Sequence, residues 1–164
     1  MELLKLVALD RDDIEVISTH LQDAKLSVGD VVWRPSEKRL VLGLARFDWE
    51  GSLADNPRFQ RRSTALRFDR VSAIKCRNVD SKDRSLILNL LAVEFTETDP
   101  PGGVVTLTFS GGAAFRLTVE CLECALVDLG PAWPADCCPK HADHPHADQP
   151  RTRAEAEAVL ERKA

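Results

Sequence analysis

Apolar and polar residues alternate over short stretches from residue 24 to residue 119, which is the pattern of half-buried β-strands. The stretch 40–44 (Leu-Val-Leu-Gly-Leu) places leucines on one face, and 105–109 repeats this pattern with Val, Leu and Phe. Ser-Gly-Gly at 110–112 then separates 105–109 from the alternating stretch 115–119. This spacing predicts a β-hairpin, and the short connections elsewhere favour six or seven antiparallel strands.

Two helices are predicted beside these strands. Asp10 occupies an N-cap position, acidic residues follow it, and apolar residues recur at spacings of three and four over 14–21. Apolar residues of 120–129 also fit a helical stripe, which Gly130 would end. Extension of the preceding strand is the alternative for 120–129, and we favour the helix.

The order of these elements predicts an α+β fold that is predominantly antiparallel β. The architecture that fits best is a six- to seven-stranded barrel, or two packed sheets, of the pleckstrin-homology-like kind. One helix would lie at the N-terminal end and one at the C-terminal end. A two-layer α+β sheet is the alternative.

The periodic pattern ends near residue 133, which divides the chain into three parts. Residues 1–133 are predicted to form a single globular β-rich domain, in keeping with a chain of 164 residues. Residues 134–150 are rich in Pro, Asp, His and Ala and are predicted to be a flexible tail bearing Cys and His. Residues 151–164 are predicted to form a marginal C-terminal helix, because short isolated helices are barely stable in water.

Composition and charge narrow the classes of partner. The chain has 22 basic and 26 acidic residues, whereas a dedicated nucleic-acid binder is usually strongly basic. No stretch approaches the roughly 20 apolar residues of a membrane helix, so we expect no membrane association. Five cysteines, an odd number, and the lack of a secretory signal at the start predict reduced thiols and a cytoplasmic location.

Six short blocks in one order resemble the alphaproteobacterial DUF2948 family, a domain of unknown function. The likeness runs from about residue 3 to residue 133. The blocks are Leu-Val-Ala-Leu-Asp (6–10), His-Leu-Gln-Asp-Ala (20–24), Arg-Phe-Asp-Trp-Glu (46–50), Leu-Arg-Phe-Asp-Arg-Val (66–71), Leu-Asn-Leu-Leu-Ala-Val (88–93) and Asp-Leu-Gly-Pro-Ala-Trp (128–133). The resemblance implies a small cytosolic bacterial protein and assigns no catalytic or binding residues. The tail after residue 133 lies outside these blocks.

A surface near residues 46–70 is the main candidate for binding another protein. Arginine and tryptophan are typical anchors of protein interfaces, and loops on a rigid sheet often carry function. The candidate residues are Arg46, Phe47, Trp49, Arg61 and Arg62. The alternative is that Phe47 and Trp49 belong to the core while Asp48 caps backbone groups. The same stretch is locally basic, but interleaved acidic residues offset its charge, so nucleic-acid binding is not favoured.

The tail contains the residue types that bind zinc. Thiolates and imidazoles are the usual zinc ligands, taken four at a time. The candidate ligands are Cys137, Cys138, His141, His144 and His146. Upstream, Cys121 and Cys124 have the spacing of a zinc knuckle, although core packing explains them more simply. A metal-binding protein is therefore the second hypothesis, while no cofactor is predicted for the domain itself.

Motifs of known enzyme classes are not found in the sequence. It contains no phosphate-binding loop, no G-x-G-x-x-G, no G-x-S-x-G and no H-E-x-x-H. A catalytic histidine in the globular domain would have to be His20. We therefore favour a non-enzymatic binding or scaffold module that contacts another protein, with an enzyme of unrecognised class as the third hypothesis.

Overall fold

Within the residues that the computed structural model describes, 3–53 and 59–135, nine antiparallel strands form one sheet. Two helices and two short 3₁₀ turns complete this part of the chain. In chain order the elements are β1 (Lys5–Ala8), α1 (Arg11–Leu21), β2 (Lys25–Arg34), η1 (Pro35–Glu37), β3 (Arg39–Phe47), α2 (Trp49–Ser52), β4 (Gln60–Phe68), β5 (Val71–Arg77), β6 (Ile87–Glu97), β7 (Gly103–Phe109), η2 (Ser110–Gly112), β8 (Ala114–Val119) and β9 (Cys124–Pro134).

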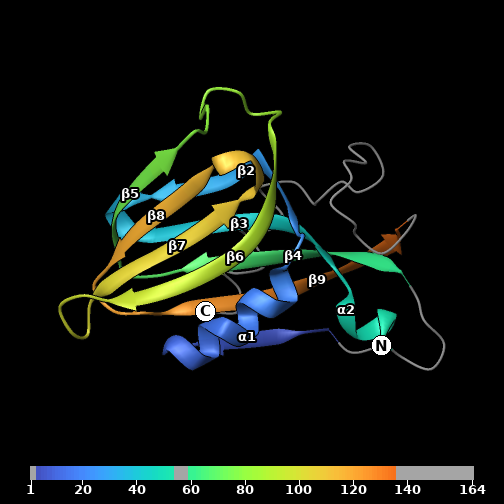
Figure 1. Cartoon of the computed structure of the whole chain (residues 1–164), viewed down its shortest axis with the longest axis horizontal. Coiled ribbons are helices and arrows are strands. Elements are labelled where there is room, and N and C mark those ends of the chain that lie inside the picture. The colour runs from blue at the N-terminus through green and yellow to red at the C-terminus, as the bar shows by residue number, and fades with distance from the viewer. Residues whose placement is uncertain (1–2, 54–58, 136–164) are drawn as a thin grey trace.

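The strand order is β1-β9-β4-β3-β2-β6-β7-β8-β5, so β1 and β5 are the two ends of the sheet. The sheet curls, and β6, β7 and β8 lie in front of β2, β3 and β4 in the view of Figure 1. It is not closed, because β1 pairs only with β9 and β5 pairs only with β8. The predicted six- to seven-stranded barrel or pair of packed sheets is therefore wrong.

The predicted C-terminal helix over 120–129 is also wrong. This stretch leads into β9, which pairs with β4 on one side and β1 on the other. Every residue from Cys124 to Leu129 is buried. A strand covered on both faces shows no two-residue alternation, so its apolar run can be mistaken for a helical stripe.

The predicted N-terminal helix and the hairpin are confirmed. The Asp10 side chain accepts a hydrogen bond of 2.8 Å from the backbone N–H of Asp13 and so caps α1. The apolar face of α1, formed by Ile14, Ile17 and Leu21, is fully buried. The predicted hairpin over 105–119 corresponds to β7 and β8, which pair antiparallel around η2.

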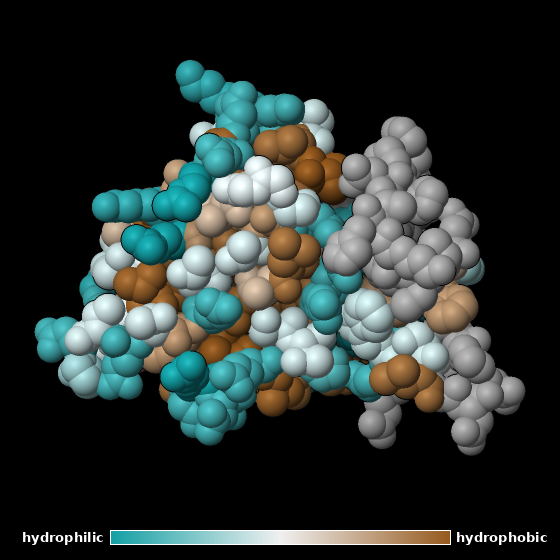
Figure 2. Space-filling model, in the orientation of Figure 1, coloured by the Kyte–Doolittle hydropathy of each residue, from teal (hydrophilic) through white to brown (hydrophobic). Residues whose placement is uncertain are grey.

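The hydrophobic core lies inside the curl, between α1 and the inner face of the sheet. Both halves of the sheet contribute to it, for example Leu42 and Leu66 from one half and Leu107 and Leu117 from the other. A smaller cluster contains Val41, which alternates with Leu40 and Leu42 and so lies on the opposite face of β3. On the side of the molecule shown in Figure 2, hydrophobic residues lie in small groups between hydrophilic ones.

Neither helix of the described residues combines the length and the apolar character needed to cross a membrane. The predicted tail (134–150) and C-terminal helix (151–164) lie outside the described residues from position 136 onward.

The close approach of β6 and β7 at Gly103 gives the first testable prediction. A Cβ atom at this position would collide with the carbonyl oxygen of Thr96 and lie 2.7 Å from the Phe95 ring. We expect Gly103→Ala to lower the free energy of unfolding by about 1–3 kcal/mol, measured by urea denaturation. Thr108→Ala, at an exposed position of the same strand, is the control and should change it by less than about 0.5 kcal/mol. Equal effects of the two substitutions would contradict this packing.

Candidate functional site

The candidate protein-binding segment forms the end of β3, the short helix α2 and the start of β4. Asp48 stands between β3 and α2, and its side chain accepts a hydrogen bond of 3.1 Å from the backbone N–H of Gly51. The Ser52 hydroxyl donates to the carbonyl of Trp49 at 2.7 Å and closes the single turn. The local sequence therefore folds this segment back against the sheet.

A buried ion pair between Arg46 of β3 and Asp128 of β9 holds this end of the sheet together. Nε and Nη2 of Arg46 donate to the two carboxylate oxygens of Asp128, each at 2.8 Å, which is the bidentate geometry of strong arginine–carboxylate pairs. The side chains are 3% and 0% exposed. Asp128 also accepts a hydrogen bond of 2.9 Å from the backbone N–H of Leu4. One carboxylate thus connects β3, β9 and the segment entering β1.

Burial and the neighbouring carboxylates act in opposite directions on the pKa of Arg46. Burial by itself lowers the pKa of Arg46, but the hydrogen bonds and the negative charge of Asp128 oppose it. The negative charges of Asp48 and Glu50 add to this effect. The pKa of Arg46 therefore lies above its ordinary value, which favours the charged guanidinium in the interior.

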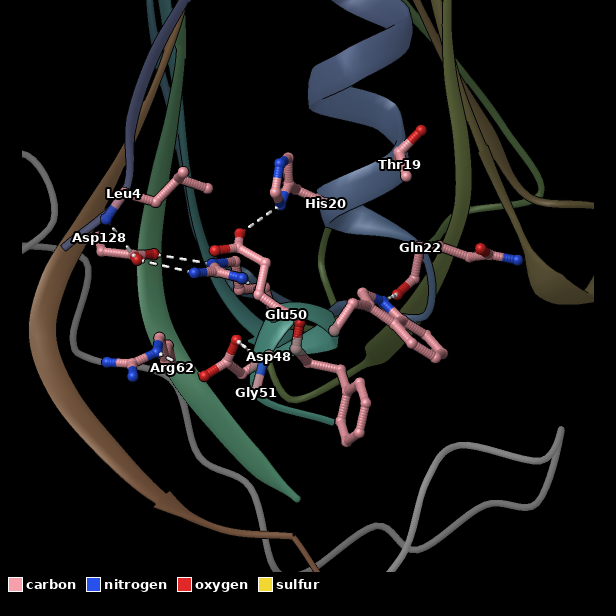
Figure 3. A network of polar contacts seen from close by, with 12 residues as sticks. Leu4, Thr19, His20, Gln22, Asp48, Glu50, Gly51, Arg62 and Asp128 are labelled. Carbon is pink, nitrogen blue, oxygen red and sulfur yellow. Dashed lines mark hydrogen bonds and ion pairs between the residues drawn. The ribbon is translucent and has the colours of Figure 1, made fainter. Parts of the chain in front are cut away.

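Two further arginines, on β4, hold neighbouring segments. Nε of Arg62 lies 3.2 Å from Oδ2 of Asp48, so Asp48 joins Arg62 to the α2 backbone (Figure 3). Arg61 lies on the opposite face of β4, and its Nη1 donates to the carbonyls of Asp23 at 3.0 Å and Ala45 at 3.2 Å. Both side chains are buried, so each one fixes the chain that surrounds it.

Helix α1 is tied to α2 by two polar contacts. Nδ1 of His20 lies 3.1 Å from Oε1 of Glu50, and Figure 3 shows the His20 ring pointing from α1 toward that carboxylate. The indole Nε1 of Trp49 donates to the carbonyl of Gln22 at 3.0 Å. These contacts place α2 at the C-terminal end of α1.

An aromatic group stands at the same end of the sheet. The ring centroids of Phe47 and Trp49 are 4.6 Å apart in an edge-on arrangement, and those of Phe47 and Phe59 are 6.4 Å apart and nearly parallel. Phe47 is fully buried, Trp49 is half-buried and Phe59 is 41% exposed. Leu53, which follows α2, is 84% exposed. We call Trp49, Leu53 and Phe59 the end surface.

The five residues proposed from sequence are thus brought together, but four of them face the interior. Arg46, Phe47, Arg61 and Arg62 are buried, and Trp49 alone is accessible in part. The packing of Phe47 and the capping by Asp48 follow the alternative interpretation of this segment. Sequence reasoning did not identify Leu53 as an exposed apolar side chain. A carboxylate inside the apolar run of β9 was the signal for the buried pair, because an interior charge needs a partner.

At this end of the sheet the charged groups hold neighbouring segments in place, and the accessible side chains offer apolar contacts. Asp128 is engaged by Arg46, Asp48 by Arg62, and Glu50 by His20. Across residues 3–53 and 59–135, no three His, Cys, Asp or Glu side chains are placed to hold a metal ion. The end surface is therefore partly apolar, and ion pairs hold the segments beneath it in place.

The candidate metal ligands cannot be placed in the same way. Cys137, Cys138, His141, His144 and His146 lie outside the described residues, so that zinc site stays a prediction. Of the upstream pair, Cys124 belongs to the core and Cys121 is half-buried. Burial raises the pKa of the Cys124 thiol well above its ordinary value, which disfavours the thiolate that zinc requires.

The chain was compared with models of protein families. Residues 4–141 match the model of the family described as Protein of unknown function (DUF2948). The match covers most of the chain and confirms the resemblance seen in the sequence blocks, and it extends past residue 133 to include Cys137, Cys138 and His141. No curated protein and no solved structure matched the chain.

The buried ion pair yields a prediction about stability. Asp128→Asn leaves the Arg46 guanidinium buried without a counter-charge, so we expect it to lower the free energy of unfolding by about 3–5 kcal/mol in urea denaturation. Glu15→Gln breaks the exposed pair of Arg11 and Glu15, at 3.8 Å, and is the matched control with an expected loss below about 0.5 kcal/mol. A loss for Asp128→Asn as small as that of the control would show that the pair does not hold this end of the sheet.

Proposed function

The chain belongs to the DUF2948 family, whose description states no activity, and we propose from the geometry that it is a non-enzymatic binding or scaffold module that contacts another protein. The contact surface lies within residues 46–70, as the sequence suggested. Its accessible part is the end surface. The buried arginines do not contact the partner themselves but keep the segments that carry the end surface in place.

The observation that carries this proposal is the exposure of large apolar side chains on a fixed base. Leu53 is 84% exposed and Phe59 is 41% exposed. Apolar area that a partner removes from water contributes roughly 25 cal/mol per Å². Exposed apolar groups with a polar rim are typical of interaction sites, and here Glu50, 60% exposed, lies beside Trp49.

The base beneath these side chains is rigid, which favours binding. The Asp48 cap and the Arg62 pair hold α2, and the Phe47 ring packs against both Trp49 and Phe59. A surface that is already ordered loses less conformational entropy when a partner binds. Binding anchors are also enriched in tryptophan, which supports a contribution from Trp49.

A role in binding accounts for the charged groups better than catalysis does. A general base or nucleophile needs a free lone pair directed at a reacting atom. In this cluster the carboxylates of Asp48 and Asp128 are buried and bonded to arginines. Glu50 faces His20, and the pair connects α2 to α1.

We also propose that the protein works in the cytoplasm. The cysteines of the described residues, Cys76, Cys121 and Cys124, are free thiols. Free thiols are the usual state of cysteine in a reducing compartment.

The end surface is tested by charge substitution at its most exposed member. Leu53→Asp should reduce the capture of the specific partner by about tenfold or more, because it places a charge in an apolar contact. The measurement is quantitative mass spectrometry of proteins retained by the immobilised full chain. Ile87→Asp, at an exposed position of β6, is the matched control and should leave capture unchanged.

Thermal unfolding of both variants separates binding from folding. We expect the melting temperatures of Leu53→Asp and Ile87→Asp to stay within a few degrees of the original chain, because both positions are exposed. If Leu53→Asp and the original chain retain the same proteins in the same amounts, the end surface is not the contact surface.

A further inference from the structure

The C-terminal half of β6 has one edge without a strand partner in the described part of the chain. β2 pairs only with Ile87–Asn89, the first residues of β6. β7 pairs with the rest, from Leu90 to Glu97, but along the other edge. From Val93 onward, the edge of β6 opposite β7 faces α1, which lies beside it in Figure 1.

The hydrogen-bonding direction along β6 shows which backbone groups lie at this edge. The N–H of Val93 donates to the Ser18 hydroxyl on α1, at 2.9 Å, and so points away from β7. The N–H of Thr98 instead donates to Gly102, at 3.2 Å, on the β7 side. Backbone groups of an antiparallel strand alternate between its two edges. The N–H and C=O groups of Phe95 and Glu97 therefore point to the same side as those of Val93.

These groups open into a groove of about 850 Å³ between α1 and β6. Ile14 and Ser18 of α1 line one wall, residues 92–97 of β6 line the other, and Cys121 and Leu122 also line it. The volume falls within the roughly 300–1,000 Å³ range of ligand sites. An added strand lies about 4.8 Å from its neighbour and places alternate side chains toward the inside and the solvent.

The groove is acidic. Its charged lining residues are Asp10, Glu15, Glu94, Glu97 and Arg11, four acidic side chains against one basic. Arg11 is itself directed at Glu15, 3.8 Å away. A ligand that enters this groove gains from positive charge.

The other open edges of the sheet differ from this one. β5 is a mostly exposed end strand that carries Lys75 and Arg77, and charged residues are a common protection against strand addition. β1 has only four residues, Lys5–Ala8. Among the described residues, the edge of β6 instead combines backbone groups that have no strand partner with the partly accessible apolar side chains of Leu9 and Phe95.

We propose that this groove binds an extended basic segment of a partner protein, which adds a short strand to β6 between Val93 and Glu97. Backbone hydrogen bonds to Phe95 and Glu97 hold the segment, as in other cases of strand addition. Apolar side chains on alternate positions face Leu9 and Phe95, which keep accessible apolar surface in the groove, and lysine or arginine side chains face the acidic rim. This site runs along α1, whereas the end surface lies beyond the C-terminal end of that helix.

Amide hydrogen exchange of the full chain, followed by NMR, tests the free state and the bound state. In the free protein we expect the amides of Phe95 and Glu97 to exchange about tenfold faster than those of Glu94 and Thr96, whose N–H groups face β7. The probe is a pool of hexapeptides in which Lys or Arg alternates with Val, Ile or Leu. Saturation with this pool should slow exchange at Phe95 and Glu97 by about tenfold or more.

A matched pair of variants separates backbone pairing from charge. Glu97→Ala removes the carboxylate but keeps the N–H, whereas Glu97→Pro removes both, and proline is tolerated where the N–H is not used in the ladder. We expect Glu97→Ala to weaken pool binding about threefold and Glu97→Pro to weaken it by a further factor of about ten. Peptides with N-methylated backbones, which need no protein variant, should bind about tenfold more weakly than the pool.

Each contrary result overturns the proposal. Equal binding of Glu97→Ala and Glu97→Pro, equal binding of N-methylated peptides, or equal binding of a pool with Glu in place of Lys and Arg would exclude a basic added strand. So would the lack of binding to any member of the pool at 1 mM. Slow exchange at Phe95 and Glu97 in the free protein would assign the edge to another segment of this chain, or to a second copy if the protection increases with concentration.

Discussion

The bidentate ion pair between Arg46 and Asp128 determines the shape of one end of the molecule. It joins β3 to β9 across β4 and also binds the backbone at Leu4, so three segments far apart in sequence meet on one carboxylate. A buried pair recovers little net stability after desolvation. The main effect of the pair is on geometry. Because the two buried charges must meet, few other registers of β3, β4 and β9 are possible. Arg62 with Asp48 extends the same restriction to α2.

The second constraint is that the curled sheet does not close, so that within residues 3–53 and 59–135 β1 and the C-terminal half of β6 each have one edge without a strand partner beside α1. Side chains of α1 accept hydrogen bonds from neighbouring backbone groups: Asp13 accepts from the N–H of Leu9, just after β1, and Ser18 accepts from that of Val93 in β6. At the C-terminal end of α1, His20 contacts α2. Both proposed sites therefore depend on α1, since the groove runs along it and the end surface lies beyond its C-terminal end.

The elements that could be predicted from sequence are those with one buried face. α1 has an N-cap and a single apolar stripe, and β7 and β8 alternate around a glycine turn, so both were identified. β9 was not, because its residues are buried on both faces and the two-residue period disappears. Local hydrophobic patterns also do not predict whether a sheet closes. Closure depends on pairing between strands such as β1 and β9, which lie more than a hundred residues apart in the sequence.

The sequence indicated a segment and five candidate residues, and the structure buries four of these five side chains. Arginine can bind a partner protein or hold the interior, and a strand pattern does not tell these apart. The deciding residues are Asp48 and Asp128, whose carboxylates draw Arg62 and Arg46 inside. A loss of binding on substitution of Arg46 would therefore report a displaced α2 or β9 rather than a lost contact. Substitutions that leave these pairs intact, as at Leu53, report on the contact surface itself.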